Sequence, residues 1–328
     1  MVKKKPLIFA AMIILLTLIA AAGSHIYKAH YNESRLKVGI AIYDSDDPYI
    51  QNLTNEVIAS LKDKTFSGRE IIYDIFDASS SYVKQNKQLY DMMQQEYDVI
   101  LWNPVMPTNV MGVLEDAQIR NIPVIIFNRE PARSDLDVLE RVWYVGTDAK
   151  EAGKMQGEML IGAWSDHSID KNQNGIVDYI LVEGEQAHTD VINRTDAFLQ
   201  TASAELSLNQ LRVISANWMR DSAFHEMQNI PENLSSEAEA IICSNDSMAL
   251  GVYDFYDKNH MEPPVIIGIN GIKDMLDAID SGNIYGTVDL NITAQSEKIL
   301  DIIEMIAENQ EDKEEEKNFY LPQYPYTK

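Results

Sequence analysis

The chain has 328 residues, with 27 basic and 51 acidic side chains and a formal net charge of −24 at pH 7. Such an acidic surface repels phosphate backbones, which excludes a nucleic-acid-binding role. Hydrophobic residues make up 45% of the chain, which excludes bulk disorder, and the length indicates about two domains. A single cysteine, Cys243, excludes an internal disulfide framework and any metal site built from several cysteines.

Residues 1–35 are interpreted as a signal peptide or membrane anchor. Met1–Lys5 is basic and Leu7–Ala22 is almost wholly apolar, which is typical of an export signal whose positive end stays in the cytoplasm. Ala20–Ala22 resembles a cleavage site, and retention of the apolar run as a single anchor is the alternative. In both cases the rest of the chain is expected to be extracytoplasmic.

The body of the chain alternates β-rich runs with helical patterns, which is typical of parallel sheets covered on both faces. We expect strands at Leu36–Tyr43, Ile71–Phe76, Val99–Trp102, Val124–Phe127, Val142–Val145, Tyr179–Val182, Leu211–Ser215, Ala240–Cys243, Val265–Ile269 and Ile284–Val288. We expect helices at Gln51–Leu61, Tyr82–Gln94, Asn109–Ile119, Ala149–Trp164, Asp190–Glu205, Ser222–Gln228, Ser247–Asn259 and Ile272–Ser281. The order predicts two doubly wound α/β lobes with a cleft between them.

Polar residues follow several of these strands, where open α/β sheets bind their ligands. His188 precedes a predicted helix, and Asp190 and Arg194 lie four residues apart on one face of it. One interpretation is a helix N-cap with a surface ion pair. The other is a group of charged side chains that hydrogen-bond a polar, neutral ligand. A catalytic role lacks a nucleophile or a recognisable metal motif.

Two aromatic residues also follow predicted strands. Tyr49 comes after the first strand, and Trp218 comes after a strand of the second lobe. Aromatic faces stack on the C–H faces of sugars as well as on apolar ligands. Ordinary packing is the alternative, and it suits Tyr49 better than Trp218.

The segment Asp170–Asp178 matches the first three-quarters of an EF-hand-type Ca²⁺ loop. Oxygen-bearing side chains occupy loop positions 1, 3, 5 and 9, a glycine occupies position 6, and the residue at position 7 would donate its backbone carbonyl. The candidate ligands are Asp170, Asn172, Asn174, Ile176 and Asp178. Position 12, normally a glutamate, is Leu181. A structural Ca²⁺ site therefore needs another carboxylate, and a polar turn is the alternative.

Taken together, the sequence resembles the periplasmic D-galactose/D-glucose-binding proteins of the type I periplasmic binding protein superfamily, from about Leu36 to at least Gln295. The matching stretches are Ile42-Tyr43 with Asp46-Asp47, Lys84-Gln85-Asn86, Phe127-Asn128-Arg129-Glu130-Pro131, Tyr144-Val145-Gly146-Thr147-Asp148, Gly184-Glu185, His188-Thr189-Asp190 with Arg194, Ser244-Asn245-Asp246-Ser247-Met248-Ala249, and Gly286-Thr287-Val288.

The resemblance implies two lobes joined by a three-strand hinge. The first lobe would comprise residues 36–146 and 290–318, and the second would comprise residues 147–289 and 319–328. It also implies a Ca²⁺ ion in the second lobe, with Glu239 as the ligand that completes the loop.

The resemblance further assigns sugar contacts. Asp47 matches the carboxylate that accepts from sugar hydroxyls, Trp218 matches a stacking residue, and Tyr49 stands where the family has phenylalanine. Asn270 replaces an aspartate, and Leu290 replaces a pocket asparagine, unless a one-residue slip brings Asp289 or Asn291 there. The remaining matches are Asn128, His188, Asp190, Arg194 and Asn245.

From this combination we expect an extracytoplasmic hexose-binding protein, galactose- or glucose-like in specificity, that closes on its sugar and presents it to an ABC importer. The alternative is a membrane-anchored sensing subunit that reports to a histidine kinase or another signalling receptor. We expect no enzymatic activity, because no nucleophile or phosphate loop is apparent. We also expect the protein to be a monomer. A sugar-responsive repressor of the same fold would need a helix-turn-helix where this chain has its apolar run.

Overall fold

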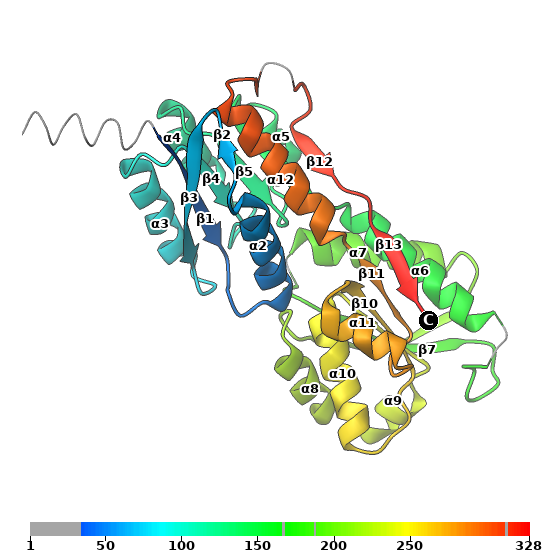
Figure 1. Cartoon of the computed structure of the whole chain (residues 1–328). Helices are drawn as coiled ribbons and strands as arrows, with labels where there is room; N and C mark the ends of the chain where they lie inside the picture. Colours follow the sequence, from blue (N-terminus) through cyan, green and yellow to red (C-terminus); the bar gives the residue numbers. More distant parts are fainter. Residues whose placement is uncertain (1–33, 166–167, 187, 312–313) are drawn as a thin grey trace, which may run out of the picture.

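The structure is a computed structural model that describes residues 34–328 except 166–167, 187 and 312–313. These residues form two lobes, each with a central sheet and flanking helices (Figure 1). The predicted signal or anchor segment, apart from its last two residues, lies outside the described part. No helix within the described ranges has the length and apolarity that a bilayer crossing needs.

The first lobe holds a seven-stranded sheet among the described residues, in the order β12-β6-β5-β4-β1-β3-β2. All neighbours pair in parallel except the short edge strand β2, which runs antiparallel to β3. The strands are β1 (Arg35–Ile42), β2 (Thr65–Phe66), β3 (Arg69–Asp77), β4 (Val99–Trp102), β5 (Val124–Phe127), β6 (Val142–Gly146) and β12 (Asn318–Tyr320).

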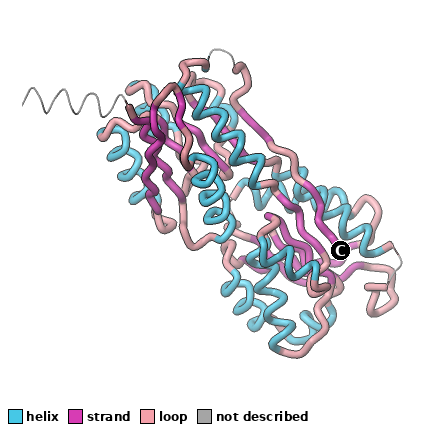
Figure 2. The backbone as a smooth tube through the Cα atoms, in the orientation of Figure 1, coloured by secondary structure: helices cyan, strands magenta, loops and turns pink. Residues whose placement is uncertain are grey.

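The helices of this lobe cover both faces of its sheet (Figure 2). They are α2 (Pro48–Leu61), α3 (Tyr82–Gln94), α4 (Met111–Ile119), α5 (Arg133–Leu136) and α12 (Ile292–Ala307). The strands β4 and β5 are buried along their whole length, as expected of parallel strands covered on two sides. Helix α2 begins where Asp47 caps its first turn and Pro48 takes the first helical position.

The second lobe holds a six-stranded sheet in the order β13-β11-β10-β9-β7-β8, counted over the described ranges. Its strands are β7 (Val177–Glu183), β8 (Leu208–Ser215), β9 (Ala240–Cys243), β10 (Val265–Asn270), β11 (Gly286–Asp289) and β13 (Tyr324–Thr327), of which only β13 runs antiparallel to its neighbour. Its helices are α6 (Ala149–Trp164), α7 (Thr189–Ala202), α8 (Arg220–Asn229), α9 (Glu232–Glu237), α10 (Asp246–Lys258) and α11 (Lys273–Asp280).

Over the residues that the structure describes, the chain passes between the lobes three times, from β6 to α6, from β11 to α12 and from β12 to β13. The predicted two-lobed fold with a three-strand hinge is therefore confirmed. The last crossing corrects one predicted boundary. Residues 319–328 were expected in the second lobe, but β12 pairs with β6 through Phe319 and Tyr320, so the crossing comes after Tyr320.

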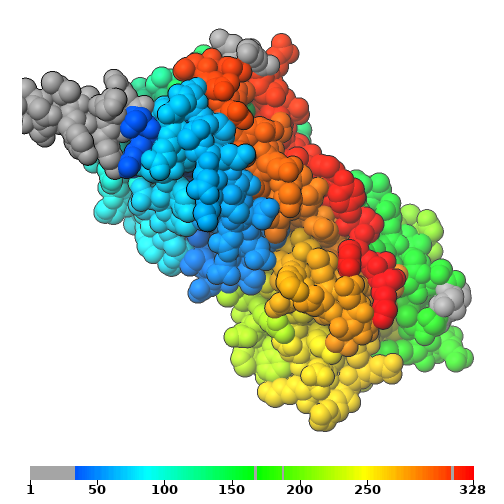
Figure 3. All heavy atoms as spheres, viewed as in Figure 1, coloured from blue at the N-terminus to red at the C-terminus, as the bar shows by residue number. Residues whose placement is uncertain are grey.

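Figure 3 shows the consequence on the surface, where the last segment of the chain (red) runs across both lobes. The pairing has a packing reason. Phe319 is buried, and the ring of Tyr320 contacts the ring of Tyr144 at 5.6 Å between centroids. A strand of three residues carries no local signal that says which of two sheets it will join.

Candidate functional site

A cleft between the lobes gathers all nine residues that the sequence predicted as ligand contacts. It measures about 340 Å³, including its open mouth, and is lined by Asp47, Tyr49, Asn128, Arg129, His188, Asp190, Arg194, Trp218, Asn245 and Asn270. Asn270 is the last residue of β10, and most of the others lie in the segments that follow β1, β5, β7, β8 and β9. The carboxyl ends of the two sheets therefore face each other across the cleft, as open α/β sheets arrange their ligand sites.

Asp47 is the acceptor at the base of the first-lobe wall. Its Oδ1 accepts from the backbone N–H groups of Tyr49 and Ile50, at 2.8 and 3.3 Å, and its Oδ2 accepts from the Tyr43 hydroxyl at 2.5 Å. Burial raises the pKa of the Asp47 carboxyl, while these hydrogen bonds act in the opposite direction. Since a carboxylate offers about four lone-pair positions, one remains for a further hydrogen-bond donor.

Tyr49 and Asn128 complete this wall and are both held by neighbours. The Tyr49 hydroxyl accepts from Gln295 Nε2 at 2.9 Å, and Gln295 also donates to the carbonyl of Leu290 at 2.6 Å. Asn128 has a positive φ of 64°, which asparagine tolerates better than most residues, and its Oδ1 accepts from Asn103 at 3.3 Å. The first-lobe wall is thus internally hydrogen-bonded.

The second-lobe wall is less satisfied. His188 caps helix α7, with Nδ1 accepting from the backbone N–H of Asp190 at 3.2 Å, so the N-cap interpretation holds. Arg194 Nη2 lies 3.6 Å from an Asp190 oxygen, and Nη1 donates to the carbonyl of Ser244 at 2.7 Å. His188 Nε2 and Arg194 Nε are buried without a hydrogen-bond partner among the described residues. Two polar atoms of this wall therefore remain for a ligand.

Burial lowers the pKa of His188, with Asp190 opposing and Arg129 assisting that effect. The imidazole is therefore neutral at pH 7. With Nδ1 accepting from the helix backbone, Nε2 carries the proton and is a donor. The wall thus presents donors from both His188 and Arg194.

Trp218 sits in the turn after β8 with φ of 70°, a region that few residues other than glycine adopt without strain. Asn245 helps to hold it, because its Nδ2 donates to the Trp218 carbonyl at 3.0 Å. Gly184 makes room for the indole, since a Cβ at this position would lie 2.3 Å from a ring carbon. The surrounding chain therefore fixes this ring at the cleft.

Asn270 closes β10 and is buried at the cleft, and the fully buried Asp246 holds the backbone directly after it. Asp246 accepts from the backbone N–H groups of Gly271 and Ile272 and from the Thr287 hydroxyl, and burial raises its pKa to about 7. Leu290 is buried and does not line the cleft, and no described neighbour of the crossover replaces it in the lining. The possible one-residue slip therefore brings no polar side chain into this cleft.

The predicted calcium loop lies at the far end of the second lobe. The backbone N–H of Asn174 donates to Oδ1 of Asp170 and of Asn172, at 3.2 and 3.0 Å, and Gly175 turns the chain with φ of 74°. Glu239, directly before β9, closes the loop, with its two oxygens accepting from the backbone N–H groups of Lys171 and Asp178.

Not every feature of this loop points to a cation. Asp178 accepts from the amide groups of Asn172 and Asn209, at 2.9 and 2.6 Å. Within the described residues no three Asp, Glu, His or Cys side chains converge as a metal cluster. The donor types and the turn suit Ca²⁺, while the carboxylates are engaged in hydrogen bonds in this arrangement.

The family described as "Periplasmic binding protein domain" matches residues 38–311, which is most of the chain. This chain belongs to the periplasmic binding protein family. The predicted resemblance is confirmed at that level, and membership indicates an extracytoplasmic location. It also places the chain among binding proteins rather than enzymes, as the sequence predicted.

Relatives and solved structures agree with this assignment. The D-galactose/methyl-galactoside binding periplasmic protein MglB of Haemophilus influenzae is 27% identical over 255 residues, which are 77% of this chain and 76% of the relative. The ribose import binding protein RbsB of Bacillus subtilis is 23% identical over 257 residues, 78% of this chain and 77% of the relative. A periplasmic solute-binding protein of an ABC transporter from Actinobacillus succinogenes, solved with D-allose, has a TM-score of 0.78 at 16% identity and covers 89% of this chain and 98% of its own.

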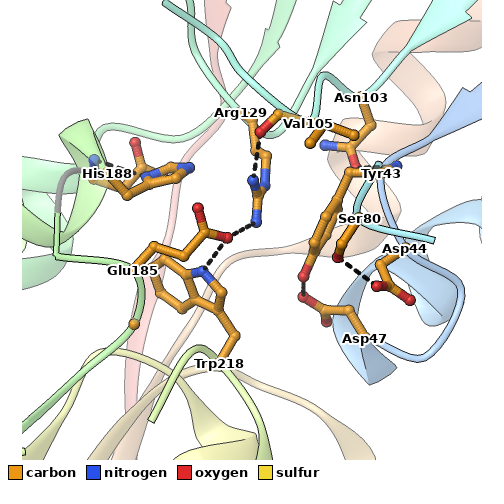
Figure 4. Close-up of polar contacts among 12 residues, drawn as sticks. Tyr43, Asp44, Asp47, Ser80, Asn103, Val105, Arg129, Glu185, His188 and Trp218 are labelled. Atoms are coloured by element: carbon orange, nitrogen blue, oxygen red, sulfur yellow. Dashed lines mark hydrogen bonds and ion pairs between the residues drawn. The ribbon is translucent and has the colours of Figure 1, made fainter. Parts of the chain in front are cut away.

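Three residues of this binding protein's cleft were not predicted as functional: Tyr43, Arg129 and Glu185 (Figure 4). Arg129 lines the cleft and contacts the other two residues, one in each lobe. All three belong to stretches that carry the family resemblance. Their roles depend on partners in different parts of the chain, and no local pattern indicates those partners.

Proposed function

We infer that this periplasmic binding protein binds a neutral sugar in the cleft between its lobes. The observation that carries this inference is the composition of the cleft lining. Two aromatic rings lie among polar groups from both lobes, and the buried atoms His188 Nε2 and Arg194 Nε are unpaired there. Sugars present apolar C–H faces for stacking and hydroxyl groups that both donate and accept.

The charges of the lining argue for a ligand without net charge. Two carboxylates, Asp47 and Asp190, face two guanidinium groups, Arg129 and Arg194. An anionic or cationic ligand would leave a buried charge uncompensated, which costs several kcal/mol. A hydroxyl-rich neutral molecule satisfies the same groups with hydrogen bonds to charged partners, which are the stronger kind.

Within the sugars we propose a hexose of the galactose or glucose type. The relative with 27% identity is a D-galactose/methyl-galactoside binding protein, and eight of the nine predicted positions keep the side chain, or in Tyr49 the aromatic character, that the resemblance assigns. Asn270 differs, because an asparagine both donates and accepts where an aspartate only accepts. The substitution therefore favours a sugar that presents an acceptor at this position.

A thermal-shift screen of the purified full chain against neutral sugars tests this proposal. A ligand that binds only the native state adds about 2.7 kcal/mol of stability at 100 times its Kd. We expect D-galactose or D-glucose to raise the melting temperature, with calorimetry giving the Kd. A shift with pentoses alone would contradict the hexose assignment, and no shift with any sugar would overturn the function itself.

We propose that the closed form delivers its sugar to an ABC importer and that the protein acts as a monomer. The importer is favoured over a sensing subunit because a relative that matches 78% of this chain is an import binding protein. Deletion of the gene should abolish uptake of the labelled sugar. Intact uptake with a lost transcriptional response to the sugar would favour the sensor instead.

We propose in addition that the loop Asp170–Asp178 with Glu239 binds Ca²⁺ in a structural role. The oxygen donors and the Gly175 turn support this, and the three carboxylates would then move onto the ion. Calcium should raise the melting temperature of the wild type relative to chelator, and Glu239→Ala should remove that difference. Glu237→Ala, at an exposed neighbouring position, is the matched control. An equal melting temperature of the wild type with calcium and with chelator would contradict the site.

A further inference from the structure

Arg129 occupies an unusual position at the end of β5 in the first lobe. Its guanidinium carbon lies 3.6 Å from the ring centroid of Tyr43, and Nη1 donates to the carbonyl of Val105 at 3.2 Å. Nη2 reaches across the cleft and donates to Glu185 Oε1 at 3.0 Å, in the loop after β7 of the second lobe. Figure 4 shows Arg129 between Tyr43 on one side and Glu185 on the other.

Within the described part of the chain, this ion pair is the one salt bridge that crosses the cleft. Among the hydrogen bonds and ion pairs of the described residues, the other bonds between the lobes run along the three crossovers, as between Leu290 and Asn270 or between Gln323 and Asp148. The crossovers persist whether the lobes are open or closed. The bond from Arg129 to Glu185 joins two strand ends that separate when the lobes open.

Each end of the pair also holds a proposed sugar contact. Glu185 Oε1 accepts a second hydrogen bond, from Trp218 Nε1, at 3.2 Å. On the other side, Arg129 lies against the ring of Tyr43, and the Tyr43 hydroxyl donates a hydrogen bond to Asp47. The contacts therefore run without a gap from Asp47 through Tyr43, Arg129 and Glu185 to Trp218.

We propose that Arg129 and Glu185 form a latch that holds the lobes closed and positions Trp218 and Asp47 on the two walls of the cleft. Neither residue needs to bond the sugar for this role. The latch adds a closing force that is independent of the ligand, so some closed protein is present before sugar binds. This inference rests on the proposed function only for its effect on sugar affinity.

The burial of the pair explains why it favours closure. The Arg129 side chain is 5% exposed and the Glu185 side chain is 46% exposed. A guanidinium so far from water needs its carboxylate partner, whereas a pair with one solvated member avoids most of the desolvation cost of a fully buried pair. The Tyr43 face adds a cation–π contact that a lysine would satisfy less well.

The latch can be measured without any ligand. Spin labels on Val83→Cys in the first lobe and Glu226→Cys in the second report the distance between the lobes, since both positions are exposed. The native Cys243 is fully buried and stays unlabelled. In the ligand-free chain, Arg129→Gln and Glu185→Gln should each shift the distance distribution toward longer values. The double variant should shift it no further than either single variant.

Sugar affinity provides the second measurement. With D-galactose as the probe, each single variant should raise Kd about tenfold, equivalent to about 1.4 kcal/mol, and the double variant by the same factor. Arg129→Lys should recover part of the loss, because it keeps the charge and loses the planar stack. Arg141→Gln is the matched control, since Arg141 pairs with Glu311 within the first lobe and away from the cleft.

The outcomes separate the latch from the function. Distance distributions of Arg129→Gln equal to those of Arg141→Gln would overturn the latch, as would fully additive effects of the two substitutions. A wild type that binds no sugar would overturn the proposed function, while the ligand-free distances would still decide the latch. Circular dichroism of each variant checks that the altered distances belong to folded protein.

Discussion

The two walls of the cleft differ in how far their polar groups are already satisfied. On the first-lobe wall, Asp47 accepts three hydrogen bonds and the Tyr49 hydroxyl accepts one from Gln295. On the second-lobe wall, His188 Nε2 and Arg194 Nε are buried and unpaired within the described part of the chain. The difference indicates that hydrogen bonds within the protein already organise the first-lobe wall, whereas the second-lobe wall gains most of its hydrogen bonds when the ligand binds.

This comparison predicts that substitutions in the second-lobe wall act mainly on Kd, whereas substitutions in the first-lobe wall act on stability as well. Leaving a buried donor unpaired costs about 1–3 kcal/mol. A ligand that pairs such donors recovers that cost on binding. A wall whose polar groups already form hydrogen bonds within the protein contributes less free energy to ligand binding.

Trp218→Ala should produce the largest change. The substitution removes the stacking face and the indole donor to Glu185, and we expect a loss of sugar affinity of at least about 100-fold. Calorimetry with D-galactose measures it, and circular dichroism checks the fold. Trp143→Phe, in the first-lobe core and outside the cleft lining, controls for general loss of packing. Unchanged affinity of Trp218→Ala would place the sugar elsewhere.

The position of Trp218 in the cleft illustrates how much the sequence could predict. Short β-rich runs located the strands, and five of them, including Val99–Trp102, have the predicted bounds or differ by one residue at one end. The rule that ligands bind beyond strand ends then located the cleft side chains. The family resemblance selected nine of them, and all nine line one cleft.

What the sequence missed depends on partners distant in the chain. Arg129 and Glu185 are 56 positions apart and lie in different lobes. Phe319 and Tyr320 were assigned to the wrong lobe because a strand of three residues carries no local signal for the sheet that it joins, which here is that of β6. Both features depend on how the three crossovers place the two lobes relative to each other, and the local hydrophobic pattern does not encode that placement.

Asp47→Asn tests the role of the first-lobe wall. Asparagine caps a helix about as well as aspartate, so helix α2 should keep its start and the melting temperature should change little. The lost charge weakens its hydrogen bonds to sugar hydroxyls, and we expect Kd to rise about 30-fold, or about 2 kcal/mol. Asp47→Ala removes the cap as well and should lower both affinity and stability. Equal melting temperatures for the two variants would contradict the capping role.

The buried carboxyl of Asp246 in the second lobe predicts that the stability of the protein depends on pH. Its pKa rises from an ordinary value of 3.8 to about 7 in the folded chain, so the folded state binds more protons between these values. Its contribution is complete below about pH 4 and is lost as pH rises through 7. The free energy of unfolding of the wild type minus that of Asp246→Asn should therefore fall by about 2 kcal/mol from pH 5 to pH 7.

The comparison with Asp246→Asn removes the influence of other groups. His188 has a lowered pKa, so its contribution is lost as pH falls below about 6.5, the opposite direction. This term is common to both proteins and cancels in the difference. Denaturant melts at several pH values supply the free energies, and a difference that does not vary with pH would contradict a neutral Asp246 at pH 5.

Tyr49→Phe should produce the smallest effect, and one confined to stability. The substitution removes the hydroxyl that accepts from Gln295, yet Gln295 keeps its bond to the carbonyl of Leu290. Losing one buried hydrogen bond costs about 1 kcal/mol, which lowers the melting temperature by a few degrees. The ring remains for stacking, so Kd for D-galactose should change less than about threefold. A tenfold change in Kd at constant melting temperature would mean that the hydroxyl serves the sugar, and the first-lobe wall would then be as dependent on its ligand as the second.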